Sequence, residues 1–246
     1  MATLLLKLSG PLQSWGSDSR FTERKTRPEP TKSGVLGLLA SALGRRRTED
    51  ISDLAALRYG VRVDQAGKLE RDYQTAHTKK YNPKTGLWEF KETMPLSNRY
   101  YLADAIFVAA LEGGAALLRQ CAEALDVPSF PLYLGRRSCP PGERIFLSYS
   151  DDCTLMEALS SEPWFARNRE ARRITKQLVQ LQVLRDPIEI DTGNELRETL
   201  RDVPISFSQE RRDYSSRTVV HDFVAVPNPY ALPEHDPMAA IEGVQK

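Results

Sequence analysis

The stretch that decides the fold runs from residue 4 to residue 44 and reads LLLKLSG PLQSWGSDSR FTERKTRPEP TKSGVLGLLA SALG. Leu4, Leu6 and Leu8 alternate with residues that point the other way, which is typical of a strand with one buried face. Gly10 and Pro11 end the strand, because proline has no N–H to donate to a strand ladder. The stretch therefore predicts a strand that leads through a loop into a helix.

Residues 33–44 are predicted to form that helix, with Thr31 or Ser33 as its cap. Its small residues fall on one side and are Gly34, Gly37, Ala40, Ser41 and Gly44. A glycine costs a helix roughly 1 kcal/mol relative to alanine, so two inside one helix indicate close backbone packing. The spacing is not a phosphate-binding P-loop, because no Gly-Lys-Ser/Thr follows.

The elements farther along the chain extend this pattern to strand, helix, strand, strand, helix, strand. They are a helix at 51–58, strands at 60–64 and 105–111, a helix at 115–125, and strands at 131–134 and 145–147. This order predicts an α+β protein with a ferredoxin-like (RRM/RAMP-type) domain over residues 1–150. Residues 151–246, with strands expected at 179–183 and 219–226, are predicted to form a smaller β-rich C-terminal domain with a loose tail after Pro227.

A polar, turn-rich segment at residues 72–99 interrupts the predicted domain. It has NPKTG at its middle, which is a turn signal, and Tyr81 and Trp88 flank that turn. A polar insertion of this length between core strands is usually functional or disordered. We therefore expect a long hairpin that protrudes from the body and carries charge.

Composition sets the broad class. The 246 residues are 41% hydrophobic and 27% charged, which is ordinary for a soluble globular protein. A net charge of +1 gives no global attraction for nucleic acid, so any such binding must come from local patches. Cys121, Cys139 and Cys153 show no metal-binding spacing. The apolar run at the N-terminus is too short for a signal peptide or a membrane span. We expect a cytoplasmic protein with no metal, no other cofactor and no membrane contact.

Several local patches could hold RNA through cations and stacked rings. Residues 20–32 contain five basic residues against two acidic ones. Gln13 could read base edges, Lys32 could bind phosphate at the helix N-terminus or remain a solvated lysine, and Trp15 could stack a base, although core packing is favoured. Arg136, Arg137 and Ser138 lie on a loop next to two prolines and would make a phosphate clamp.

Two further basic runs leave both interpretations open. Residues 45–47 are three arginines that follow the predicted helix, and they fit either a solvated helix end or an RNA contact. Arg211 and Arg212 lie in a basic and aromatic segment of the second half, where the partner is undecided.

Catalytic signals are few. The histidines are His77, His221 and His235, and none lies in a metal-binding or nucleophile motif. Metal-independent RNA cleavage needs a base and an acid, and His77 with Lys79 and Tyr73 could supply them. The alternative, which the sequence favours, is that these are hairpin residues that contact backbone or solvent.

Four stretches, in this order and at these spacings, resemble one known family closely. They are GPLQSWG (10–16), PTKSGVLGLL (30–39), RDYQT (71–75) and YLGRRSCP (133–140). They resemble the CasD subunits of type I-E CRISPR Cascade complexes, in the RAMP superfamily. The resemblance covers residues 1 to about 150.

The resemblance implies a non-catalytic antiviral defence subunit that caps the 5′ handle of the crRNA. It implies as partners the CasC backbone subunit, the large CasA subunit and, near the PAM-proximal end, target DNA. A hairpin thumb at about residues 75–99 would wedge beside the handle–spacer junction. Type I-C relatives process CRISPR repeat RNA themselves, which keeps an endoribonuclease with His77, Lys79 and Tyr73 as the alternative.

The implied handle cradle combines the patches with the thumb. Its predicted RNA-binding residues are Gln13, Trp15, Arg24, Lys25, Arg27, Lys32, Ser33, Lys79, Lys80, Arg99, Arg136, Arg137 and Ser138.

Overall fold

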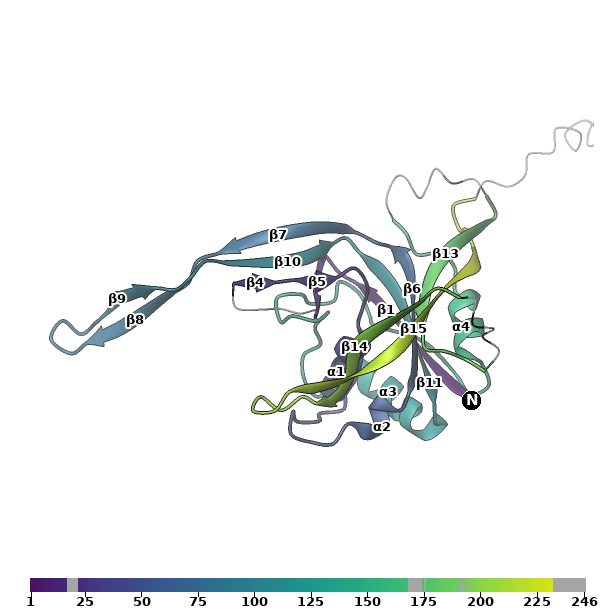
Figure 1. Cartoon of the computed structure of the whole chain (residues 1–246), viewed down its shortest axis with the longest axis horizontal. Coiled ribbons are helices and arrows are strands. Elements are labelled where there is room, and N and C mark those ends of the chain that lie inside the picture. Colours follow the sequence, from purple (N-terminus) through teal and green to yellow (C-terminus); the bar gives the residue numbers. More distant parts are fainter. Residues whose placement is uncertain are drawn as a thin grey trace, which may run out of the picture.

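A seven-stranded antiparallel sheet forms the body of the molecule in a computed structural model (Figure 1), which describes residues 1–16, 22–167, 174, 176–189, 191, 193 and 195–231. Its strands, in spatial order, are β12 (Phe146–Ser150), β1 (Ala2–Ser9), β11 (Ile106–Gly113), β6 (Arg58–Gln65), β13 (Leu178–Arg185), β15 (Asp213–Pro227) and β14 (Arg197–Ser206). The fold is therefore a mixed α+β fold, as the sequence predicts.

The alternation in β1 divides its side chains between two hydrophobic layers. Leu4, Leu6 and Leu8 are buried with α1 (Lys32–Ala42) and α3 (Ala115–Asp126) on one face of the sheet. Leu5 is buried on the other face, against α4 (Leu155–Ser161). The second face of β1 is thus partly covered too, while Lys7 pairs there with Glu143 at 2.9 Å.

The predicted boundary at residue 150 does not coincide with a break in the sheet. β13 hydrogen-bonds to β6, so the C-terminal strands continue the sheet of the N-terminal half. Val183 and Val224 also share one hydrophobic layer with Leu5 and Val108. The expectation of a separate smaller domain is corrected in this respect: the second half is β-rich, but it extends the first. Most of the predicted tail lies outside the described residues.

Three smaller sheets lie beside the body. They are β2 (Leu12–Gln13), β10 (Ser97–Ala103), β4 (Glu23–Arg24) and β7 (Lys68–Gln74) in the first, β3 (Trp15–Gly16) with β5 (Thr26–Arg27), and β8 (His77–Asn82) with β9 (Leu87–Thr93). β7 and β10 leave the body as a ribbon, and β8 and β9 continue it as a hairpin that projects far from the body (Figure 1). The polar insertion is therefore an ordered protruding hairpin.

Local sequence signals explain where α1 and α4 begin. Thr31 is the N-cap of α1, and its hydroxyl oxygen accepts from the backbone N–H of Gly34 at 3.2 Å. α4 begins with a capping box between Thr154 and Glu157. The remaining helix, α2, is the short segment Ser52–Ala55.

Among the described residues, no helix is long and apolar enough to cross a membrane.

One expected strand is absent, and one observed strand was not expected. Residues 131–134 belong to no sheet, because Leu134 turns to bond with Cys139 and Ser14 instead. β14 was not predicted, since its ladder with β15 contains two irregularities and Pro204 stands within it.

Candidate nucleic-acid interface

Gln13 and Trp15 are internal, which corrects their prediction as RNA contacts. Both side chains are fully buried. The Gln13 amide donates to the backbone oxygens of Leu8 and Ala105 at 3.0 and 2.7 Å, and its oxygen accepts from the Trp15 indole N–H at 3.1 Å. Gly34 of α1 packs directly on the Trp15 ring, since a β-carbon there would lie 2.8 Å from a ring atom. This pair fixes the end of β1 to α1 and has no amide group left to read a base.

Lys32, which was predicted to bind phosphate, is also internal, and its charge is paired within the protein. Its ammonium group lies 3.1 Å from a carboxylate oxygen of Asp186, and its backbone N–H donates to Asp202 at 2.8 Å. Asp202 therefore takes the place at the α1 N-terminus that an anion would otherwise occupy. Lys32 therefore joins the start of α1 to Asp186 and Asp202 in the C-terminal half of the chain.

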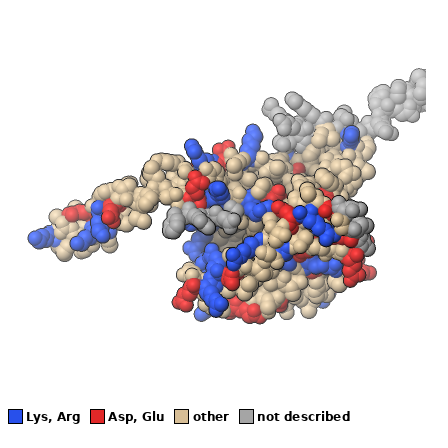
Figure 2. Space-filling model, viewed as in Figure 1, with Lys and Arg blue, Asp and Glu red and all other residues tan. Residues whose placement is uncertain are grey.

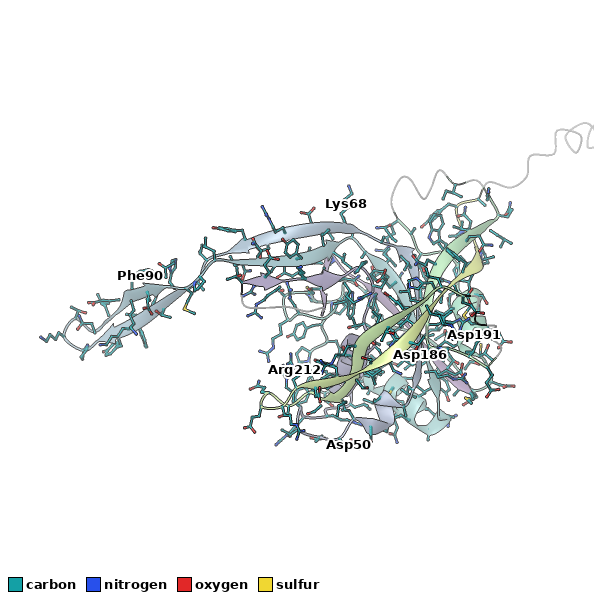
Figure 3. The ribbon with its side chains drawn as sticks, viewed as in Figure 1. Asp50, Lys68, Phe90, Asp186, Asp191 and Arg212 are labelled. Carbon is teal, nitrogen blue, oxygen red and sulfur yellow. The ribbon has the colours of Figure 1, made fainter. Side chains whose placement is uncertain are left out.

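Arg217 completes this buried network. Its guanidinium bonds Asp186 at 2.5 Å and Asp202 at 2.7 Å, and Asp186 also accepts from the backbone N–H of Tyr59 at 3.0 Å. Burial lowers the pKa of Arg217, but its hydrogen bonds and attraction to Asp202 and Asp186 outweigh burial and raise that pKa above its usual value. Figure 3 labels Asp186 inside the body, where α1, β6, β14 and β15 meet. The network joins the two halves of the chain.

Arg27 and Ser33, which were also predicted to contact RNA, interact with other side chains of the protein. The Arg27 guanidinium lies 3.3 Å from Glu198 of β14, and the Ser33 hydroxyl lies 3.4 Å from the Thr31 hydroxyl. Each is half-buried beside the start of α1. Neither residue belongs to the open surface described next.

The loop at residues 135–140 has a backbone that only glycine allows at its first position. Gly135 has φ +90°, and a β-carbon there would lie 1.8 Å from the backbone oxygen of Ser14. The loop closes on itself through hydrogen bonds from Leu134 N to Cys139 O at 2.7 Å and from Cys139 N to Arg136 O at 2.9 Å. The loop therefore packs against Ser14, between β2 and β3, the strands that carry Gln13 and Trp15.

Arg136 anchors this loop to the ribbon root, by which we mean the part of β10 that pairs with β4. Its guanidinium donates to the backbone oxygens of Tyr100 (3.2 Å), Arg24 (2.6 Å) and Lys25 (3.3 Å) and lies over the Tyr101 ring, 4.9 Å from the centroid. Both of its terminal nitrogens donate to backbone oxygens, so Arg136 holds the loop in place, which is a different role from the phosphate clamp predicted for it. Tyr101, which the sequence did not single out, is the platform for this contact.

Near this loop, basic side chains without a carboxylate partner define an open basic surface. We give this name to Arg24, Lys25, Arg99 and Arg137, together with the Ser138 hydroxyl. Arg24, Lys25, Arg137 and Ser138 are exposed, and in the described part of the chain none of these cations forms an ion pair. The Ser138 hydroxyl lies 3.4 Å from the Tyr101 hydroxyl.

Arg99 adds an unsatisfied donor to this surface. The register places Arg99 of β10 beside Arg24 of β4. The Arg99 Nε atom is buried and makes no hydrogen bond to any residue that the structure describes. A buried donor without a partner costs roughly 1–3 kcal/mol. Several like charges held together on an exposed surface are the chemistry that binds a polyanion.

The hairpin carries Lys79 and Lys80 on β8, and both are exposed. Tyr81 packs on Trp88 with ring centroids 5.6 Å apart, and His77 packs on Phe90 at 4.9 Å. Figure 3 shows Phe90 far out on the hairpin, and Figure 2 shows Lys side chains at the hairpin end. The hairpin is a basic and aromatic arm.

The alternative catalytic residues do not form one cluster. Tyr73 is an exposed residue of β7, whereas His77 and Lys79 belong to β8 in a different sheet. The described contacts of the His77 ring are with Phe90, and no hydrogen bond joins it to Tyr73 or Lys79 within the described residues.

Comparisons with known proteins agree on one family. Residues 3–220 match the family model described as CRISPR-associated protein (Cas_Cas5). The Escherichia coli (strain K12) protein "CRISPR system Cascade subunit CasD" is 35% identical over 156 residues, which cover 58% of this chain and 69% of that protein.

Two solved structures are similar over nearly the whole chain. A chain of a "CRISPR RNA-guided surveillance complex" is 30% identical with a TM-score of 0.73, covering 98% of each chain. The chain in "Crystal structure of Cas protein" is 39% identical with a TM-score of 0.65, covering 96% of this chain and 100% of that one. The fold match thus includes the C-terminal strands beyond residue 150.

Proposed function

The chain belongs to the CRISPR-associated protein (Cas_Cas5) family, as a CasD-type Cascade subunit, and we propose that it binds and caps the 5′ handle of the crRNA. The observation that carries the proposal is the open basic surface, where Arg24, Lys25, Arg99 and Arg137 lack carboxylate partners within the described chain. Guanidinium groups bind phosphate through paired donors. The handle backbone would run across the ribbon root.

The fold supports the same assignment. The chain order β1, α1, β6, β11, α3, β12, with β1 between β12 and β11, supports a ferredoxin-like core. The arm formed by β8 and β9 would be the thumb beside the handle–spacer junction, with Lys79 and Lys80 near the RNA. Its aromatic pairs would hold a hairpin that has no core beneath it.

The proposal includes partners and excludes catalysis. The neighbouring subunits would be the CasC backbone subunit and the large CasA subunit, with target DNA near the PAM-proximal end. Binding without cleavage is supported by the described contacts of His77, whose ring packs on Phe90 and has no hydrogen bond to Tyr73 or Lys79 within the described residues. An acid and a base must lie within reach of one scissile phosphate.

The test is site-specific crosslinking in the assembled complex. Photoreactive uridine is placed at single handle positions or single spacer positions of the crRNA, and the crosslinked peptides are mapped. We expect handle positions to crosslink to residues 22–27, 97–103 and 135–140 of this chain. Handle probes that crosslink only to other subunits would contradict the proposal.

A second measurement addresses catalysis. The purified chain is incubated with CRISPR repeat RNA in excess EDTA, and we expect the RNA to stay intact. Metal-independent cleavage that His77→Ala abolishes would contradict the non-catalytic assignment, whereas cleavage insensitive to His77→Ala indicates a contaminating nuclease.

A further inference from the structure

The arm formed by β8 and β9 has two chemically different faces, which the strand register defines. Tyr81 lies directly opposite Trp88. Lys79 lies directly opposite Phe90, two residues farther from the turn on each strand. Cross-strand partners share a face, and so do residues two apart on one strand. The His77 ring belongs to the same face, because it packs on Phe90 with ring centroids 4.9 Å apart. We call these five residues the ring face.

Both acidic residues of the hairpin lie on its other face. Glu89 lies opposite Lys80, and its carboxylate accepts from the Asn82 amide at 2.7 Å. Glu92 lies opposite Thr78. The ring face, all of whose residues the structure describes, therefore carries rings and a cation but no carboxylate.

The rings of the ring face are open to solvent. Trp88 is 66% exposed and Phe90 is 61% exposed. Figure 1 shows the hairpin projecting from the body, and Figure 3 labels Phe90 far out on it. The two residues are two apart on β9, so their Cα atoms are separated by about 7 Å and each ring presents its own surface. Lys79 is exposed beside them and makes no ion pair within the described residues.

We propose that the ring face stacks unpaired bases of the crRNA, with Lys79 against the RNA backbone. Every nucleobase has a π face that an open aromatic ring can stack on, and a cation beside the rings matches the phosphates. An apolar protein surface in this place would bury Lys79 without a counter-charge, which is costly. A duplex does not fit either, because only unstacked bases can lie on aromatic side chains.

The crRNA is the occupant because the arm begins beside the open basic surface. β9 ends at Thr93 and β10 begins at Ser97, and Arg99 of the open basic surface is two residues farther along β10. An RNA backbone bound at Arg99 would therefore continue along the ribbon onto the arm. The inference rests on the proposed function, and it adds that bases next to the handle are held by rings as well as by cations.

Trp88 allows a direct test, because it is the exposed tryptophan among the three in the chain, and Trp15 and Trp164 are buried. The full-length chain is titrated with a handle-containing crRNA, and the tryptophan emission and its quenching by acrylamide are measured. We expect bound crRNA to reduce the emission and to shield Trp88 from acrylamide. Unchanged emission and unchanged quenching at saturating crRNA would contradict stacking on Trp88.

Two ring variants separate stacking from folding of the hairpin. Trp88→Ile and Phe90→Ile each remove a ring but keep an apolar residue that favours strands. The matched control is Leu87→Ile, because Leu87 is also 66% exposed but lies on the other face, opposite Asn82. Each ring variant is expected to raise the Kd for crRNA about fivefold or more, with an unchanged salt-dependence slope. The control is expected to change neither quantity.

An RNA with abasic nucleotides across the handle–spacer junction tests whether bases are the ligand. We expect the wild-type chain and Trp88→Ile to bind this RNA equally. If Trp88→Ile loses as much affinity for the abasic RNA as for the intact crRNA, the ring only supports the hairpin and the proposal is overturned.

The remaining outcomes distinguish the ring face from the proposed function. If the ring variants bind crRNA normally while Arg137→Gln still lowers the salt-dependence slope, the ring face is not an RNA site and the proposed function stands. If the ring variants bind crRNA normally and fail only to assemble with the other subunits, the ring face docks a protein and the proposal is overturned. If Arg137→Gln also has no effect, the proposed function fails as well.

Discussion

The buried network around Asp186 and the open basic surface at the ribbon root use the same kinds of cation in opposite ways. Lys32 and Arg217 lie within 3.1 Å of carboxylates and are almost buried. Arg24 and Arg137 are exposed and have no carboxylate partner in the described residues. The difference lies in the acidic residues that the fold brings near, and not in the basic residues themselves.

The acidic partners explain why the position of a basic residue along the chain does not predict whether it is free to bind phosphate. Lys32 stands at a helix N-terminus, where phosphate is often bound, yet Asp202 and Asp186 reach it from 170 and 154 residues away. Arg137 has no comparable partner, so its charge remains available. A basic residue in this fold is therefore free to bind RNA only where the fold supplies no carboxylate.

Removal of Asp186 is expected to have the largest effect. Asp186→Ala leaves Lys32, Arg217 and the Tyr59 N–H without a shared acceptor in a buried site. Loss of one member of a buried ion pair costs about 3–5 kcal/mol, measured as the free energy of unfolding in urea. The control Asp151→Ala, which breaks the exposed pair with Arg119, is expected to cost less than about 1 kcal/mol. Equal losses in the two variants would show that the network is not structural.

Gly135→Ala is expected to disrupt the open surface without altering a charge. The β-carbon would collide with the Ser14 oxygen in a backbone with φ +90°, so the loop must move. We expect a stability loss of roughly 1–3 kcal/mol and a clear loss of crRNA affinity.

The matched control for that loop is Gly86→Ala in the hairpin turn. Gly86 has φ +69° but has no atom within 4 Å of a built β-carbon. We expect only the strain cost there, about 1 kcal/mol, with crRNA affinity retained. Equal affinity losses in both variants would mean that the 135–140 loop has no special role.

Arg136→Ala separates anchoring from phosphate binding. The variant removes three hydrogen bonds to backbone oxygens and the contact with the Tyr101 ring. We expect a stability loss of about 1–2 kcal/mol, faster hydrogen exchange at residues 135–140, and weaker RNA binding. Arg136→Lys is expected to recover only part of the exchange protection, because one ammonium cannot span the three oxygens. Unchanged exchange in Arg136→Ala would remove the anchoring role.

Arg137→Gln is expected to have the smallest effect on folding and a defined effect on RNA. The side chain is exposed, so the free energy of unfolding should change by no more than about 0.5 kcal/mol. One lost phosphate contact should lower the salt-dependence slope by about 0.7 for single-stranded RNA. A normal slope in this variant would exclude Arg137 from the RNA contact.

Sequence periodicity predicted the elements whose local signals are strong. The alternation in residues 4–8, the Thr31 cap and the turn at 82–86 all reappear as β1, α1 and the β8–β9 hairpin. β14 was missed because Pro204 and two ladder irregularities hide its period. The continuous sheet was missed because the β6–β13 pairing joins segments more than a hundred residues apart.

The site was predicted in part, for a related reason. Sequence alone located the 135–140 loop and the basic segment near Arg24, which meet through Arg136. It could not assign Gln13 to the backbone oxygens of Leu8 and Ala105, nor Arg136 to those of Tyr100 and Arg24, because backbone acceptors carry no residue signature. Whether a polar side chain is occupied is a property of the tertiary structure.

The most direct test compares the salt dependence of crRNA binding in two folded variants. We expect the triple variant Arg24→Gln, Arg99→Gln and Arg137→Gln to lower the slope by about 2. We expect Lys32→Met to leave the slope unchanged, since Asp186 keeps its pair with Arg217. A lower slope in Lys32→Met with a normal slope in the triple variant would contradict the claim that only cations without carboxylate partners hold the RNA.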